Sequence, residues 1–510
     1  MTNNPITRRK FIGLVGAATL TSSTLPFARA TEQTPLWSKL PRWRGFNLLE
    51  KFSGGNAPFR EDDFRNLSDL GFNFVRLPMN YKHWIKNGDW RQFDEKTLND
   101  IDQAIEFGKK YGVHVNINFH RAPGYTVNTP PENPLIWHND EALDVCKLHW
   151  QTFAKRYRGI SSDQLSFNLF NEPAGCSEED YYRVVKTILE GIRNEDPDRL
   201  VICDGIDWGG KPCFSFKELQ VAQATRGYAP MEISHFGANW VNSANFPEPQ
   251  WPFYSFNGLL PSKTKSEMPE AVRKPLTIAG EFVDGGVLRL KIGTVSRASE
   301  LVVTIDGKEA LRRKFVSGPG KGEWQEVVFV EQYNLYQNVF NLELSVQIPK
   351  GARRIEIANV DGDWLTLAEL GITTPTCPEI LANGSQDWGA SEQTRLLFSE
   401  QAGKGALAGG TTRDREWLRR QNVEPWRKLS DQGVGVIVGE FGAFNRTPHK
   451  IALAWLEDML ANWRDANWGW ALWNFRGPFG VADSGRDDVK YEDWRGLKLD
   501  REMVALLQRY

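Results

Sequence analysis

The stretch Leu165-Ser-Phe-Asn-Leu-Phe170, followed directly by Asn171-Glu172-Pro173, decides the fold. Its six leading residues have the length and apolar character of a short buried strand, and two polar side chains and a proline end it. Similar apolar runs stand at residues 44–48, 72–77, 113–119 and 200–203. Each run predicts one strand of the same sheet, and we expect Pro78 to stop the second strand.

Helical patterns separate these strands. Leu98, Ile101 and Ile105 recur at the spacing of one helix face, and Gly112 follows as a natural helix stop. Residues 60–70 and 143–157 show the same kind of pattern. Strands that alternate with helices over this distance predict a parallel sheet with helical crossovers.

Polar side chains gather at the ends of the predicted strands. They are Arg76, His120, Asn171 and Glu172. In a barrel of parallel strands the chemistry is carried by residues at the carboxyl ends of the strands. A single polar residue at a strand end is unremarkable, but four in succession predict a functional site.

After Trp240 the alternation of strands and helices stops. Residues 241–275 are rich in Pro, Ser and Asn and are typical of loop. From about 276 to 372 the period changes to two, as where Leu288, Leu290 and Ile292 alternate with charged residues. Short alternating strands with turn signals between them predict a β-sandwich.

Helices return in the last hundred residues, at 413–432, 449–463 and 500–509, with strands at 435–439 and 468–473. Eight strand–helix units result only if the β-rich block interrupts them. The predicted fold is therefore α/β: a (β/α)8 TIM barrel interrupted between strands six and seven by a β-sandwich. The expected boundaries are 31–275 and 373–510 for the barrel and 276–372 for the sandwich.

Composition limits the classes of function. The chain has 510 residues, 41% of them hydrophobic and 25% charged, which is typical of a soluble globular protein. A formal net charge of −2 gives no basic surplus for nucleic acid. The 20 Trp residues suggest carbohydrate, because sugar-binding clefts use such aromatic faces. We expect no cofactor and no metal, since the five Cys residues share no metal-type spacing.

The first thirty residues are predicted to lie outside the fold. Arg8-Arg9-Lys10-Phe11 precedes an apolar run to Leu20 that is shorter than the roughly 20 residues of a membrane span. Ala28-Arg29-Ala30 has the small residues of a cleavage site. Paired arginines followed by Phe indicate a twin-arginine export signal, hence a periplasmic or extracellular protein without a membrane span in its mature chain. Cys203 and Cys213 either pair or remain free thiols, and we assign no disulfide.

Five motifs occur in order at the strand ends: Arg76-Leu-Pro78, His120-Arg121, Asn171-Glu172-Pro173, Val438-Gly-Glu440-Phe-Gly442 and Trp470-Ala-Leu-Trp473-Asn474. With this order and spacing the chain resembles the retaining glycoside hydrolases of family 5, the cellulase family. The resemblance covers about residues 42–240 and 413–510.

The resemblance implies a role for each residue. Glu172 would be the acid/base and Glu440 the nucleophile of a retaining mechanism. Arg76 would keep Glu440 ionised, because a nearby positive charge favours a carboxylate. Asn171 would bind the sugar 2-hydroxyl and His120 another hydroxyl of the same sugar, while Trp473 would stack beneath the ring.

The predicted sixth strand departs from the family pattern. Family members carry His-x-Tyr here, with the Tyr hydroxyl on the nucleophile, whereas this chain has Arg226-Gly-Tyr228. Tyr228 fits the Tyr position, and Arg226 stands where the His is expected. Either His235 supplies the imidazole from the following turn or the site works without it. Arg226 either forms an ordinary ion pair or binds an anionic or unusually decorated sugar.

A second glutamate resembles the nucleophile. Ile278-Ala-Gly-Glu281-Phe282 echoes the segment around Glu440, but the β-rich block follows it where the last barrel strand is needed. We therefore favour Glu440. In the sandwich, Trp324, Tyr333, Tyr336 and Trp364 are candidate sugar platforms, although aromatic residues of a sandwich are more often core.

The function expected from the sequence is retaining hydrolysis of β-glycosidic bonds in a polysaccharide or oligosaccharide, foremost a β-1,4-glucan. A β-mannanase and an exo-acting β-glycosidase are alternatives within the enzyme class. A non-catalytic glycan-binding protein is the alternative of another class, and the presence of both Glu172 and Glu440 argues against it.

Overall fold

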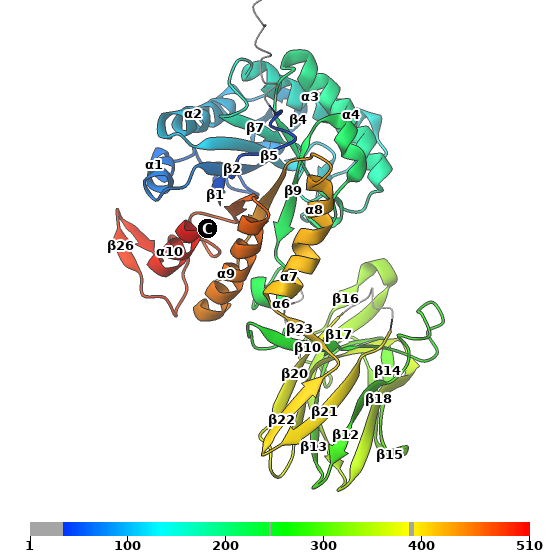
Figure 1. Ribbon diagram of the computed structural model, residues 1–510. Coiled ribbons are helices and arrows are strands. Elements are labelled where there is room, and N and C mark those ends of the chain that lie inside the picture. The colour runs from blue at the N-terminus through cyan, green and yellow to red at the C-terminus, as the bar shows by residue number, and fades with distance from the viewer. Residues whose placement is uncertain (1–33, 242, 244–245, 387–391) are drawn as a thin grey trace, which may run out of the picture. The chain divides into compact units, whose positions relative to one another are not determined.

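The computed structural model describes residues 34–241, 243, 246–386 and 392–510 (Figure 1). Within these residues, eight parallel strands close into a barrel in the order β2-β1-β25-β24-β9-β8-β7-β5, and the pairing of β2 with β5 completes the ring. This arrangement confirms the predicted TIM barrel. The predicted export signal, residues 1–30, lies outside the described residues. No helix in the described part of the chain is long and apolar enough to cross a membrane.

The barrel strands and helices fall close to the predicted ranges. The strands are β1 (Arg44–Asn47), β2 (Phe74–Asn80), β5 (His114–Ala122), β7 (Leu165–Asn168), β8 (Val201–Asp204), β9 (Ala222–Gly227), β24 (Val436–Phe441) and β25 (Gly469–Leu472). The helices are α1 (Glu61–Asp69), α2 (Glu95–Tyr111), α3 (Asp140–Arg156), α4 (Glu178–Glu195), α5 (Ile206–Gly209), α6 (Met231–Ser234), α7 (Arg415–Leu418), α8 (Glu424–Ser430), α9 (His449–Asp465) and α10 (Arg501–Arg509). Short elements beside the barrel are β3 (Ile85–Lys86), β4 (Asp89–Phe93), β6 (Tyr125–Thr126), β26 (Glu492–Trp494) and β27 (Leu497–Leu499).

Helix α2 shows why the helical pattern was informative. The side chain of Asp94 accepts a hydrogen bond from the backbone N–H of Lys96 and caps the first turn. Leu98 and Ile101 are fully buried against the barrel, as their spacing predicts. Gly112 ends the helix with a φ of 66°, a left-handed conformation that glycine adopts without steric cost.

Pro78 does not end β2, which continues to Asn80. The neighbouring strand β1 pairs with β2 only as far as Arg76, so beyond this point β2 is paired on the β5 side alone. A proline lacks the N–H donor but is tolerated where one side of a strand needs no partner. The prediction of a stop at this proline was therefore wrong.

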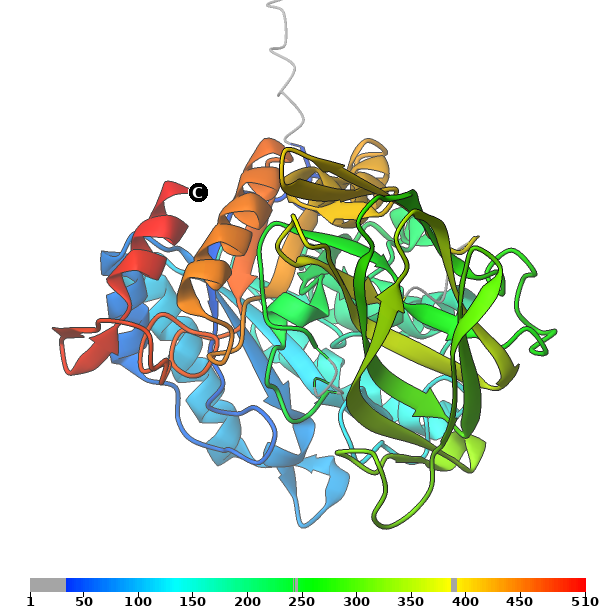
Figure 2. The ribbon, with the colours of Figure 1, turned by 90° about the horizontal axis from the view of Figure 1, so that it is seen from below.

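Between β9 and β24 the chain forms the two sheets of a sandwich (Figure 1 and Figure 2). One sheet has the order β16-β17-β13-β19-β20-β10-β23 with β11 paired to β19, and the other has the order β15-β14-β18-β12-β21-β22. Its strands are β10 (Phe253–Asn257), β11 (Leu259–Pro261), β12 (Leu276–Phe282), β13 (Gly286–Ser296), β14 (Ala298–Ile305), β15 (Lys308–Val316), β16 (Phe329–Val330), β17 (Leu335–Ile348), β18 (Ala352–Gly362), β19 (Trp364–Thr373), β20 (Ile380–Ser385), β21 (Arg395–Gln401), β22 (Lys404–Ala408) and β23 (Thr411–Arg413). The insertion between strands six and seven is confirmed.

The sheets extend beyond the predicted block 276–372 at both ends. Residues 253–261, predicted as loop, form β10 and β11, and β20 to β23 lie in a part that we assigned to the barrel. The Pro, Ser and Asn residues of the first segment led to a prediction of loop, although β10 is a largely buried strand. In β21, Leu396 and Phe398 point into the core while Leu397 is exposed, a period of two that is too short to stand out in sequence.

The tryptophan excess mostly serves packing. The largest fully buried side chains among the described residues include Trp84, Trp137, Trp150, Trp426, Trp455, Trp463 and Trp470. All of them belong to the barrel's apolar core. Large aromatic side chains bury much area each and stabilise such a core. The sandwich has an apolar core of its own, to which Leu288, Leu290 and Ile292 contribute as their alternation predicts.

Candidate active site

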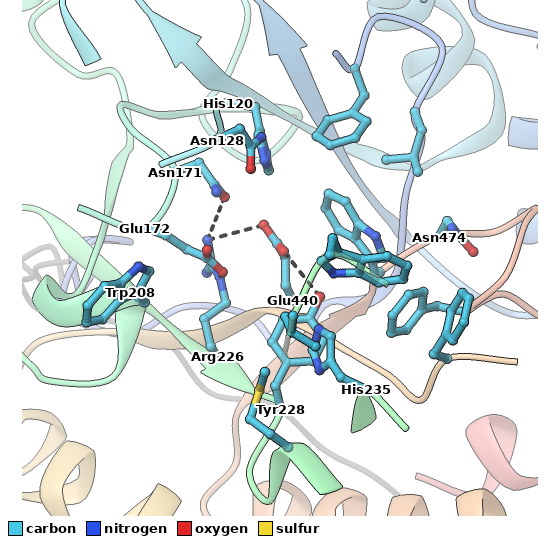
Figure 3. Close-up of a pocket in the computed structure, with 18 of the residues that line it drawn as sticks. His120, Asn128, Asn171, Glu172, Trp208, Arg226, Tyr228, His235, Glu440 and Asn474 are labelled. Atoms are coloured by element: carbon cyan, nitrogen blue, oxygen red, sulfur yellow. Dashed lines mark hydrogen bonds and ion pairs between the residues drawn. The ribbon is translucent and has the colours of Figure 1, made fainter. Parts of the chain in front are cut away.

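The carboxyl ends of the barrel strands surround a cavity of about 940 Å³ (Figure 3). Seven of the eight site residues singled out in the sequence line it: His120, Asn171, Glu172, Tyr228, His235, Glu440 and Trp473. The eighth, Arg76, lies beneath them and contacts Glu440. The structure therefore brings the whole predicted set together.

Glu440 lies near the end of β24 and is 3% exposed. Its Oε1 accepts a hydrogen bond from Arg76 Nη1 at 2.6 Å and lies 3.2 Å from Arg226 Nη2. Its Oε2 accepts a bond from the Tyr228 hydroxyl at 3.2 Å. Two guanidinium groups and a phenol thus face the Glu440 carboxyl group.

Three asparagine side chains hold Arg76 in place by hydrogen bonds. Its Nε donates to Asn168 Oδ1 at 2.9 Å and its Nη1 to Asn47 Oδ1 at 3.0 Å. Its Nη2 donates to Asn171 Oδ1 at 2.9 Å. The guanidinium is 1% exposed, so its charge acts on Glu440 with little screening by water.

Glu172 follows β7 in an unusual backbone conformation, with a φ of 51°. Side chains on both sides hold this conformation: the backbone N–H donates to Asp204 Oδ2 at 2.9 Å, and the carbonyl accepts from the Tyr125 hydroxyl at 2.6 Å. Non-glycine residues in this region are strained, and such strain is found at functional sites. The conformation directs the Glu172 side chain into the cavity beside Arg226.

The two glutamates have different environments. The pKa of Glu172 is raised to about 7, chiefly by burial and then by the nearby Glu440 and Asp204 carboxylates, while Arg226 acts in the opposite direction. A carboxyl group with this pKa carries a proton for much of the time at neutral pH, whereas its partner is surrounded by cationic donors. The site can therefore present a proton donor and a carboxylate to the same bond.

Arg226 lies between the two glutamates (Figure 3). Its Nε donates to Glu172 Oε1 at 2.9 Å, its Nη2 donates to Asn171 Oδ1 at 2.9 Å, and it also forms a short ion pair with Asp204. Burial alone would lower the pKa of Arg226, but the surrounding carboxylates outweigh it and raise the pKa. The Arg226 guanidinium therefore forms ion pairs within the protein, and it has three carboxyl partners, Glu172, Asp204 and Glu440.

His235 does not take the place that Arg226 fills. Its Nδ1 lies 2.8 Å from Ser234 Oγ, and its ring packs edge-on against Tyr228. Among the described residues it has no hydrogen bond to either glutamate. Burial lowers the pKa of His235 to about 4, so its ring is neutral near neutral pH. Of the two alternatives, the geometry matches a site without an imidazole at this position.

Two buried polar groups in the cavity lack a partner in the part of the chain that the structure describes. They are His120 Nδ1 and Asn474 Oδ1. Burial and the neighbouring arginines lower the pKa of His120 well below its usual value, so this ring is also neutral. An unsatisfied buried polar atom costs free energy, and a ligand with hydroxyl groups would remove that cost here.

The barrel has recognisable relatives. The family model for cellulases of glycosyl hydrolase family 5 matches residues 32–232. This part of the chain, which includes the barrel strands β1 to β9, is therefore similar to glycosyl hydrolase family 5. It is 25% identical to cellodextrinase A of Ruminococcus flavefaciens over 36% of this chain and 55% of the relative. It is 24% identical to endoglucanase C of Acetivibrio thermocellus over 36% and 54% of the two chains. The chain therefore spans about half the length of these curated relatives.

Solved structures extend the likeness to most of the chain. The crystal structure of a glycoside hydrolase covers 92% of this chain and 99% of its own, with 26% identity and a TM-score of 0.59. Cel5A of Thermotoga maritima, solved with mannotriose, matches with 14% identity and a TM-score of 0.51, over 93% and 99% of the two chains. At that identity the second likeness shows the fold alone.

Sequence reasoning missed Asp204, which ends β8 and is fully buried beside Arg226. The signal that identified Glu172, a polar residue at the end of an apolar run, applies equally to Asp204 in Val201-Ile-Cys-Asp204. Asn474 was quoted only as part of a motif, yet it is 2% exposed and lines the cavity.

Tryptophans near the cavity divide into two kinds. Trp208 and Trp240 are 60% and 56% exposed and line the cavity. Trp137 packs in the core, and Trp251 is buried and donates to Asp458. Of the four loop tryptophans, the two exposed ones are therefore available to a ligand. Trp473 lines the cavity wall beside Phe52, with ring centroids 5.4 Å apart.

Glu281 does not belong to this site. It lies on β12 of the sandwich, with a side chain that is 75% exposed and 3.8 Å from Arg353. Elsewhere in the sandwich, Tyr333 and Trp364 line a cleft, whereas Trp324 packs against Phe340 and Tyr336 against Phe329.

The five cysteines are all free thiols, including Cys203 and Cys213. Among the described residues no group of three or more His, Cys, Asp or Glu side chains is placed to hold a metal ion.

Proposed function

We propose that this protein hydrolyses β-glycosidic bonds with retention of configuration, acting as an endoglucanase-like enzyme on β-1,4-glucan. The observation that carries the proposal is the pair Glu172 and Glu440, which reach into one cavity and contact the same guanidinium. Retaining enzymes place their carboxyl groups about 5–5.5 Å apart, whereas inverting enzymes leave room for a water molecule between them. Contact with a single guanidinium favours the shorter separation.

In this mechanism Glu440 attacks the anomeric carbon and Glu172 donates its proton to the departing oxygen. A glycosyl-enzyme ester results, and Glu172, now a carboxylate, removes a proton from the water that hydrolyses the ester. Arg76 and Tyr228 hold the Glu440 carboxylate before attack. Because these donors are fixed by other side chains, little reorganisation is needed when charge moves.

The cavity walls supply the sugar contacts. Arg76 and Arg226 both donate to Asn171 Oδ1, which leaves the amide N–H of Asn171 as the donor for a sugar 2-hydroxyl. His120 Nδ1 accepts from or donates to a further hydroxyl, according to its tautomer, and Asn474 Oδ1 accepts from another. Trp473 offers its face to the sugar ring.

The assignment to β-1,4-glucan is supported by the names of the relatives, a cellodextrinase and an endoglucanase. The test is a panel of β-glucans, mannans, xylans and aryl β-glycosides with product analysis. Internal cleavage of β-1,4-glucan that Glu172→Gln and Glu440→Gln each abolish supports the proposal. Turnover confined to mannan, or release of single sugars from chain ends, assigns a different specificity, and no turnover on any β-glycoside overturns it.

The rate is expected to fall as the pH rises above about 7. Glu172 has its pKa raised to about 7 and must be protonated to assist the leaving group. Above that pH the acid form is lost, and kcat/KM should fall about tenfold for each further pH unit. A pH profile of kcat/KM on an unactivated oligosaccharide measures this. A profile that stays flat to pH 9 contradicts the role of Glu172.

Trp208 is expected to bind the departing part of the substrate. It lies on the Glu172 side of the cavity, and its backbone N–H donates to the carbonyl of Pro173 (Figure 3). Trp208→Ala should lower kcat/KM on long oligosaccharides about fivefold, because a stacking contact is worth about 1 kcal/mol. Aryl glycosides, which lack those sugars, should be hydrolysed at the original rate. Trp208→Phe keeps a platform and serves as the control, and an equal loss on both substrates would contradict this placement.

We further propose export of the chain by a twin-arginine-type signal in residues 1–30, supported by Arg8-Arg9 before an apolar run and by Ala28-Arg29-Ala30. A periplasmic or extracellular location would bring the enzyme to polymeric glucan.

We also propose that the inserted sandwich binds glycan, with Tyr333 and Trp364 as the contacting aromatic residues, since both line one cleft.

A further inference from the structure

Two glycines, Gly209 and Gly439, leave the space that the Arg226 side chain occupies. A Cβ atom on Gly209 would lie 2.8 Å from Arg226 Cγ, and one on Gly439 would lie 2.9 Å from Arg226 Nη1. Real Cβ atoms do not approach so closely, so a side chain at either position would displace the arginine. The side chain of Arg226 is 5% exposed and its three nitrogens point in fixed directions.

Asp204 connects the same guanidinium to the backbone of Glu172. It pairs with Arg226 Nη2, and its Oδ2 accepts the Glu172 N–H at 2.9 Å. Its Oδ1 accepts from Asn168 Nδ2 at 3.0 Å, and Arg76 Nη2 lies 3.8 Å away. Asp204 is fully buried, and these neighbours supply the hydrogen bonds that water would otherwise give to its carboxyl group.

The charges around Glu172 balance in one protonation state. Arg76 and Arg226 carry two positive charges, and Asp204 and Glu440 carry two negative ones. With Glu172 protonated the cluster is neutral, and ionisation of Glu172 adds a buried negative charge without a further cation. Uncompensated buried charge is costly, so each member of the cluster alters the energy of that ionisation.

We propose that Asp204 and Arg226 are a pair of positioning residues that tune the proton transfer of Glu172 in opposite directions. The Arg226 guanidinium, 2.9 Å from Glu172 Oε1, stabilises the carboxylate form. The Asp204 carboxylate stabilises the acid form by repulsion and also holds the Glu172 backbone. Arg226 stands where family 5 members carry a histidine, and the inference rests on the proposed role of Glu172 as proton donor.

Other groups that face Glu172 stay unchanged in the test. The titratable and charged ones, by element, are Arg76 on β2, His120 on β5, Tyr125 on β6, Tyr228 after β9 and Glu440 on β24. Burial and the neighbouring arginines keep His120 neutral by lowering its pKa, and burial keeps the phenols protonated by raising theirs. Asp204 and Arg226 are therefore the two charges to remove, and each removal also takes away one ion pair, with Arg76 for Asp204 and with Glu440 for Arg226.

The test follows the Glu172 carboxyl carbon by NMR against pH in the full chain labelled at the glutamate side-chain carboxyls, with Glu172→Gln to assign the signal. Asp204→Asn should lower the midpoint by about one pH unit and Arg226→Gln should raise it by about one, the size expected of a charge at this distance. The double variant should return to within about half a pH unit of the original midpoint. Arg226→Lys, which restores the charge, should lie closer to the original than Arg226→Gln does.

Circular dichroism of each variant shows whether the barrel folds. If Arg226→Gln does not fold, the near-isosteric Asp204→Asn and the charge-preserving Arg226→Lys can still be titrated. Shifts of the two single variants in the same direction, or no shift in either, overturn the pairing. The NMR titration needs no substrate, so it is independent of the proposed function. Opposed midpoints in a chain without glycosidase activity overturn the proposed function alone, and turnover without opposed midpoints overturns the pairing alone.

Discussion

Replacement of Glu440 with Gln should reduce kcat/KM on β-1,4-glucan oligosaccharides by at least about 10⁴-fold, because an amide cannot attack the anomeric carbon. The substitution preserves size and leaves an oxygen that accepts from Arg76 or Tyr228, so the fold and substrate binding should survive. Initial-rate kinetics of the purified variant, with substrate affinity measured separately by calorimetry, separate loss of chemistry from loss of binding.

The matched control is Glu281→Gln. Glu281 stands in a segment of nearly the same sequence, but its side chain is exposed on β12 of the sandwich. We expect this variant to keep the original rate. If Glu281→Gln abolished turnover while Glu440→Gln retained it, the assignment of the nucleophile would be wrong.

Replacement of Glu172 with Gln should give a loss that depends on the leaving group. On unactivated oligosaccharides, where the departing oxygen needs a proton, the rate should fall by about 10²–10⁴-fold. On a dinitrophenyl β-glycoside, whose leaving group departs as an anion, formation of the glycosyl-enzyme should be little affected. Single-turnover kinetics on both substrates measure the two effects.

The same variant should lose the fall in rate above pH 7, since the group whose pKa is about 7 is gone. A glutamine at this position still accepts from Arg226 Nε, so the cluster keeps its geometry. Equal losses on activated and unactivated substrates would show that Glu172 has a structural role and is not the proton donor.

Much of the barrel site follows from local sequence. Arg76, His120, Glu172 and Glu440 each lie at or near the end of an apolar strand, and the topology of a parallel barrel brings such ends to one face. Glu281 and Glu440 have similar neighbours, and only the position of the sandwich in the chain distinguished them. This shows that a local motif needs the order of elements around it.

The Asp204–Arg226 pair could not be predicted in the same way. Each residue alone reads as a charged strand end, and their contact arises because β8 and β9 are neighbours in the barrel. The exposure of Trp208 and the burial of Trp137 likewise depend on loop packing, for which sequence gives no periodic signal. The strands of the sandwich that lie outside residues 276–372 were missed because they are short, and β10 and β11 also contain the Ser and Pro residues that are typical of loop.

The central claim, retaining hydrolysis through Glu440, is tested most directly by the configuration of the first product. Proton NMR of the anomeric region, recorded in the first minutes of β-1,4-glucan oligosaccharide hydrolysis, distinguishes the two anomers before they interconvert. The account predicts that the β anomer appears first and the α anomer later by mutarotation. Initial release of the α anomer would show a single displacement by water and would contradict the assignment of Glu440 as nucleophile.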